Sequence, residues 1–161
     1  MLRPLLIAAV ALTLAVTGQA ASLCKPDERV VFACTAKPKR VSACASGNLS
    51  RPEGRLIYRF GRDAAHIELE HGADKPPREA GFRFGYDGWA KGASSRLMFT
   101  RGGFRYVVEH AAGVFGVDGG DNYAQVQVWR GDQLLATVRC DEPSAQDHLY
   151  EVLQPLGLPA E

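Results

Sequence analysis

The feature that most constrains the fold is a succession of short segments rich in β-branched and aromatic residues, which follow one another from residue 29 to residue 140. In segment 55–60, large apolar residues occupy every second position, at Leu56, Tyr58 and Phe60. A period of two is typical of a strand with one buried face. The predicted strands are residues 29–35, 40–44, 55–60, 66–70, 81–86, 96–100, 104–109, 123–130 and 133–140.

Short glycine-containing turns separate several of these strands. Gly102-Gly103 lies between segments 96–100 and 104–109, and Gly131-Asp132 lies between segments 123–130 and 133–140. Such spacing is typical of hairpins. We therefore predict an all-β fold, an antiparallel sandwich or closed barrel of about eight to nine strands.

Only the last residues have a helical pattern. Ser144 is a predicted N-cap, and Asp147 three residues later resembles a capping box. Gly157 and Pro159 are typical of the end of a helix. The apolar residues of the predicted helical face are Leu149, Val152 and Leu153. We expect one short C-terminal helix.

Residues 1–20 have the pattern of a secretory signal peptide. Arg3 precedes an apolar run over residues 5–16 that only Thr13 interrupts, and the small residues Gly18 and Ala20 precede the expected cleavage point. The run is shorter than the ~20 residues of a membrane-spanning helix, so no membrane insertion is expected. The chain is then a single domain over residues 21–161, located in the periplasm or secreted.

The overall charge excludes some classes of partner. The chain has 19 Lys and Arg residues against 18 Asp and Glu residues, a formal net charge of +1. A balanced charge provides no general attraction to phosphate backbones, so no nucleic-acid partner is expected.

Four cysteines in an exported chain indicate two disulfides. Four cysteines allow three pairings. If residues 34–44 form a hairpin centred on Lys39, Cys34 and Cys44 face each other across it, which leaves Cys24 and Cys140 to join the first residues to the last strand. The cysteine spacing has no CxxC motif and no adjacent histidine, so we expect no metal at these residues.

Two groups of residues are candidates for binding. On a strand, His66, Glu68 and Glu70 point to one face and have the donor atoms for a divalent metal or a carbohydrate, although strand alternation alone also explains a polar face there. Segment 85–96 is predicted to be a long loop between strands, and long loops in small domains are often functional. Its candidate partner-binding residues are Trp89, Ser94, Ser95 and Arg96.

Aromatic side chains offer another possible binding surface, for a carbohydrate or a protein, since Tyr and Trp provide rigid contact area. Packing in the core is the alternative for each of them. The residues concerned are Tyr86, Trp89, Tyr106 and Trp129. The sequence contains neither GxSxG nor HExxH, so we expect a non-catalytic protein without a cofactor.

Several short motifs resemble those of a group of small exported bacterial proteins. The matching segments are Cys24, Val31-Phe32-Ala33-Cys34, Lys39-Arg40-Val41-Ser42-Ala43-Cys44, Tyr58-Arg59-Phe60-Gly61, Glu68-Leu69 and Val138-Arg139-Cys140. This resemblance implies an all-β secreted domain.

More distantly, Gly92-Ala93-Ser94-Ser95-Arg96 resembles the Ser/Gly-rich loop of periplasmic inhibitors of c-type lysozymes. Those inhibitors are small disulfide-bearing β-barrels. The resemblance implies that Ser94 and Arg96 hydrogen-bond the catalytic carboxylates of a lysozyme-like enzyme.

Three functional hypotheses follow. The first is an exported, non-catalytic binding module, in its sharpest form an inhibitor of a lysozyme-like cell-wall lytic enzyme. The second is a metal- or carbohydrate-binding envelope protein that uses the His66, Glu68 and Glu70 face. The third is a purely structural envelope protein.

Overall fold

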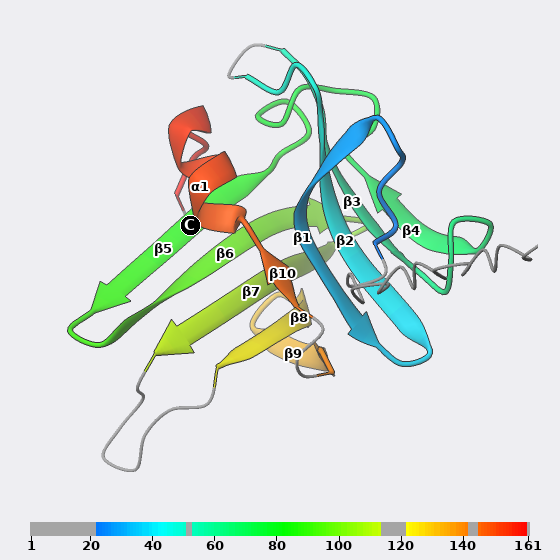
Figure 1. Ribbon diagram of the computed structural model, residues 1–161. Helices are drawn as coiled ribbons and strands as arrows, with labels where there is room; N and C mark the ends of the chain where they lie inside the picture. Colours follow the sequence, from blue (N-terminus) through cyan, green and yellow to red (C-terminus); the bar gives the residue numbers. More distant parts are fainter. Residues whose placement is uncertain (1–21, 51–52, 114–121, 142–144, 161) are drawn as a thin grey trace, which may run out of the picture.

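The computed structural model describes residues 22–50, 53–113, 122–141 and 145–160 (Figure 1). The predicted signal peptide therefore lies outside the described residues. The strands are β1 (Glu28–Ala36), β2 (Lys39–Ser46), β3 (Leu56–Gly61), β4 (Ile67–His71), β5 (Arg83–Trp89), β6 (Gly92–Arg101), β7 (Phe104–Gly113), β8 (Tyr123–Arg130), β9 (Gln133–Arg139) and β10 (Gln146–Asp147). A short helix α1 (Leu149–Leu153) and a 3₁₀ turn η1 (Gln154–Leu156) follow.

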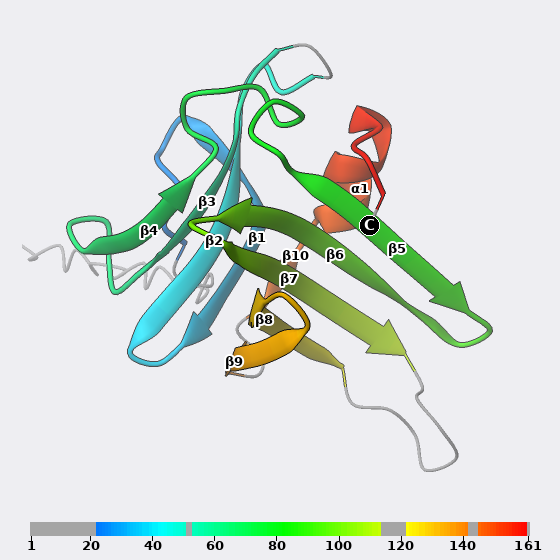
Figure 2. The same ribbon diagram turned by 180° about the vertical axis from the view of Figure 1, so that it is seen from behind.

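The strands form two antiparallel five-stranded sheets. The first sheet has the order β10-β1-β2-β3-β4, and the second has the order β5-β6-β7-β8-β9. The two sheets pack as an open sandwich, while α1 lies against the second sheet beside β5 and β6 (Figures 1 and 2). The prediction of an all-β sandwich with a short C-terminal helix is confirmed. Among the described residues, no helix has the length and apolarity needed to cross a membrane.

The core lies between the sheets. Phe32 of the first sheet and Leu97 and Val108 of the second are fully buried in one apolar cluster. Aromatic rings form its centre, with Phe99 4.9 Å from both Tyr58 and Tyr106 between ring centroids. These residues alternate along their strands, so one face of each sheet is apolar, as the period of two predicts.

The C-terminal helix begins later than predicted. Ser144 lies outside the described residues, and the residue before α1 is His148, which makes no side-chain cap. The preceding Gln146 and Asp147 form β10 instead, which pairs with Phe32 and Ala33 of β1. Because the backbone of these two residues is extended and paired with β1, the helix can begin only after them.

The predicted disulfide pairing is wrong. The structure joins Cys24 to Cys44 and Cys34 to Cys140. The hairpin between β1 and β2 turns at Lys37-Pro38 rather than at Lys39, so that Cys34 lies opposite Val41 and not opposite Cys44. Its two cysteines consequently lie at different positions along the strands and meet different partners.

The two faces of the first sheet explain which partner each cysteine meets. Cys34 belongs to the core and reaches Cys140, which follows β9, so that this disulfide links the two sheets. Cys44 alternates with the core residues Ala43 and Ala45 and points to the outer face. Leu23 crosses that face, donating its backbone N–H to Ser42 Oγ at 2.9 Å, which brings Cys24 to Cys44.

Candidate binding face on the second sheet

Segment 85–96 is not the predicted loop. Residues 85–89 belong to β5 and residues 92–96 to β6, and the two strands form a hairpin in which Trp89 lies opposite Gly92. The sequence indicated a loop because glycine is depleted in strands. Tertiary packing explains these glycines, since long side chains lie over them.

Two glycines provide space for the side chains that the sequence singled out. A Cβ atom on Gly85 would lie 3.2 Å from Nη2 of Arg96, and one on Gly92 would lie 2.8 Å from Cε2 of Trp89. Arg96 and Trp89 therefore lie close against the sheet instead of projecting from a loop.

Both tryptophans of the chain lie on the outer face of the second sheet, opposite the core. Trp89 pairs with Gly92 at one end of this face, and Trp129 pairs with Arg105 at the other. Both are partly exposed. Large aromatic residues on the outer face of a sheet do not serve the core between the sheets and are typical of binding surfaces.

A polar row crosses the middle of the same face. Arg96, Glu109, Gln125 and Arg139 lie directly opposite one another on β6, β7, β8 and β9. Gln125 Nε2 donates to Glu109 Oε2 at 2.9 Å. Arg96 Nη1 lies 2.6 Å from Asp87 Oδ2 and 3.9 Å from Glu109 Oε1. These contacts hold charged and amide groups in fixed positions on the outer face, where Glu109 is 13% and Gln125 6% exposed.

Tyr123 belongs to this network. Burial raises the pKa of Tyr123, and the charge of Glu109 together with a hydrogen bond to it raises that pKa further. The Arg139 guanidinium lies 5.9 Å from the Tyr123 ring centroid. The phenol is therefore a neutral hydrogen-bond donor on this face.

The structure brings three of the four predicted partner-binding residues together. Trp89, Ser94 and Arg96 share the outer face, and Arg96 Nη1 donates to Ser94 Oγ at 3.3 Å. Ser95 points to the opposite face, where it lies beside Tyr86 and His110. The Arg96 side chain is 20% exposed, compared with 63% for Asp87.

The other aromatic candidates have different environments. Tyr106 packs in the core against Phe99. It therefore follows the alternative of core packing and not that of a binding surface. Tyr86 is exposed on the inner side of the second sheet, where its ring lies 4.6 Å from that of Tyr150 in α1.

The predicted metal or carbohydrate face does not form a joint site. His66 Nδ1 lies 2.7 Å from Asp63, Glu68 pairs with Lys39, and Glu70 accepts a hydrogen bond from Arg59. The three side chains are thus each held by a different neighbour.

A separate group of three residues has possible metal-binding atoms, but two of them are joined in a disulfide. Within the described ranges, Cys24, Glu28 and Cys44 place three possible ligand atoms within 4.8 Å of one another. The two cysteines are joined as a disulfide, so their sulfurs are not thiolate ligands.

Glu109, Tyr123, Gln125 and Arg139 were not identified as site residues from the sequence. Each occupies a polar position in a predicted strand, which was a signal for an outer face but not for a shared site. Their meeting depends on the register between strands, which local sequence leaves open. No family model, curated protein or solved structure matches this chain.

Proposed function

We propose that this protein is an exported, non-catalytic binding module that holds a protein partner on the outer face of the second sheet. The observation that carries the proposal is the placement of both tryptophans on this face, on either side of the fixed Arg96–Glu109–Gln125 row. Rigid aromatic rings and arginines with oriented polar partners are the groups that contribute most to protein interfaces.

A lysozyme-like cell-wall lytic enzyme is the partner that we propose in particular. Glycosidases of this kind have a pair of carboxylic residues in the catalytic cleft. The binding face offers Arg83, Arg96, Arg105 and Arg139, and guanidinium groups are suited to carboxylates. Arg96 would contact such carboxylates from within strand β6, with Ser94 beside it, and not from a protruding loop.

The proposed location is the periplasm or the extracellular space. The two disulfides support it, because disulfides persist in oxidising compartments. The pattern of residues 1–20 supports export through a cleaved signal peptide.

The test is inhibition of c-, g- and i-type lysozymes by the purified, oxidised protein. We expect inhibition of at least one enzyme class, and a loss of about tenfold or more for Arg96→Gln and for Trp89→Ala, because each removes one of the proposed contacts. Arg62→Gln is the matched control, since Arg62 is 58% exposed on the turn after β3, away from this face.

Two results would count against the proposal. Absence of inhibition across the panel would remove the lytic enzyme as the partner. Inhibition that survives both Arg96→Gln and Trp89→Ala would remove the outer face of the second sheet as the binding site.

A further inference from the structure

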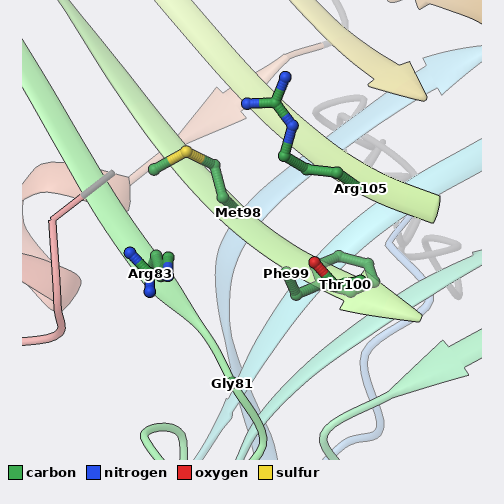
Figure 3. Close-up of a pocket in the computed structure, with 6 residues that line it drawn as sticks. All are labelled: Gly81, Arg83, Met98, Phe99, Thr100 and Arg105. Carbon is green, nitrogen blue, oxygen red and sulfur yellow. The ribbon is translucent and has the colours of Figure 1, made fainter. Parts of the chain in front are cut away.

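A pocket of about 210 Å³ lies at the Trp129 end of the second sheet, away from Trp89. Figure 3 shows the side chains of Arg83, Met98 and Arg105 there, one from each of β5, β6 and β7. Met98 lies between the two arginines and is only 2% exposed. The volume is several times the ~30 Å³ share of one water molecule, which leaves room for a small hydrated ion.

Both arginines are held in place by the protein. Arg83 Nη1 donates to the backbone carbonyl of Ala160 at 2.7 Å. The guanidinium carbon of Arg105 lies 5.2 Å from the centroid of the Trp129 ring. Side chains that are already ordered lose less conformational entropy when a ligand binds.

The strand partners of these arginines are uncharged. Arg83 lies opposite Met98, and Arg105 lies opposite Thr100 and Trp129. The pocket therefore combines two positive charges, an apolar side chain and the Thr100 hydroxyl group on a single surface.

We propose that this pocket binds an oxyanion, the carboxylate or phosphate group of a small ligand. The planar guanidinium donates paired N–H bonds that match the oxygens of both groups, and the Thr100 hydroxyl is a further donor. This site lies at the Trp129 end of the face proposed for the partner, and its test is separate because Thr100 lies eight residues along β6 from Gly92, the partner of Trp89. That separation is about 27 Å along a strand.

The two tryptophans make the test specific. Each indole N–H gives one signal in a proton–nitrogen correlation spectrum, and Trp89→Phe assigns the pair. The oxidised protein is titrated with sodium phosphate and with sodium D-glucuronate at constant ionic strength. We expect a saturable shift of the Trp129 signal and a stationary Trp89 signal with at least one of the two oxyanions.

Three variants locate the binding. Arg83→Gln and Arg105→Gln should weaken the binding measured by calorimetry by about tenfold or more, since each removes a charged donor. Arg78→Gln is the matched control for Arg83→Gln. Arg78 also donates to a C-terminal carbonyl, that of Gly157, at 2.6 Å, so this variant reveals any effect of releasing the C-terminal segment.

The relative affinities of phosphate and glucuronate identify which oxyanion the pocket prefers. The proposal is overturned if neither oxyanion gives a saturable shift at millimolar concentration, or if the signals of both tryptophans move together. It is also overturned if Arg78→Gln weakens binding as much as Arg83→Gln does.

Discussion

Arginine side chains occupy two different settings in this protein. Arg59 is 3% exposed and lies between Glu28 and Glu70, with Nη1 2.5 Å from Glu28 Oε2. Burial by itself raises the pKa of Glu28, but its hydrogen bonds, first that from Arg59, outweigh burial and hold the pKa below its usual value. Arg96 also pairs with carboxylates but is 20% exposed, on the outer face of the second sheet. The first arrangement anchors the N-terminal segment, and the second lies on the face that we propose for a partner.

His71 makes the stability of the fold depend on pH. Its ring stacks on Phe99 with centroids 4.4 Å apart, and Nε2 donates to the carbonyl of Ala80 at 2.8 Å. Burial lowers the pKa of His71 below its usual value of 6.5. Between the lowered pKa and 6.5 the unfolded chain binds more protons than the folded one, so stability decreases as the pH falls through this range.

We predict that the free energy of unfolding decreases between pH 7 and pH 5 because of His71, whose pKa is lower in the folded state. His71→Gln keeps a donor for Ala80 and should reduce this decrease. Urea unfolding at a series of pH values measures it. His66→Gln, at an exposed histidine, tests whether removing any histidine has the same effect. Equal pH dependence in the parent and in His71→Gln would contradict the prediction.

Among the elements, the β5–β6 hairpin shows where the local sequence pattern fails to predict a strand. Strand β8 coincides with the predicted segment 123–130, because its apolar residues alternate without interruption. Residues 85–96 lack that pattern, since Gly85, Gly92 and Ser94 occupy outer positions beneath larger side chains. The conformation there is determined by pairing with the neighbouring strands and by large side chains that pack over the glycines, and neither is visible in the local sequence pattern.

Gly92 is required by the close approach of β6 and β7. A Cβ atom on Gly92 would lie 2.5 Å from the carbonyl oxygen of Ala112 and 2.8 Å from the Trp89 ring. We predict that Gly92→Ala destabilises the protein by about 1–3 kcal/mol, because the backbone must shift. Gly47→Ala should have little effect, because a Cβ atom on Gly47 meets nothing within 4 Å. Thermal unfolding of both variants measures these effects. Similar losses of stability in the two variants would contradict this explanation.

For the whole molecule, the two disulfides have different roles. Cys24–Cys44 spans 20 residues and fixes the N-terminal segment on the first sheet, whereas Cys34–Cys140 spans 106 residues and connects the two sheets. In the chain-entropy model, the longer loop contributes about 4.7 kcal/mol and the shorter about 3 kcal/mol.

We predict that replacing both Cys34 and Cys140 by Ala lowers the free energy of unfolding more than replacing both Cys24 and Cys44. Chemical denaturation of the two double variants measures the difference. Mass mapping of the parent after proteolysis without reduction establishes the pairing directly. A Cys34–Cys44 peptide in that map, or equal losses in the two variants, would contradict the arrangement.

The sequence by itself determined the all-β class, most of the strands and the turns at Gly102-Gly103 and Gly131-Asp132, because these depend on alternation and turn chemistry between neighbours in the chain. Only the tertiary structure decided which cysteines pair and which side chains share the outer face of the second sheet. A shift of the β1–β2 turn from Lys39 to Lys37-Pro38 is enough to give Cys34 and Cys44 different partners. Register, disulfide pairing and the assembly of a binding face depend on contacts between residues far apart in the chain, which no local pattern specifies.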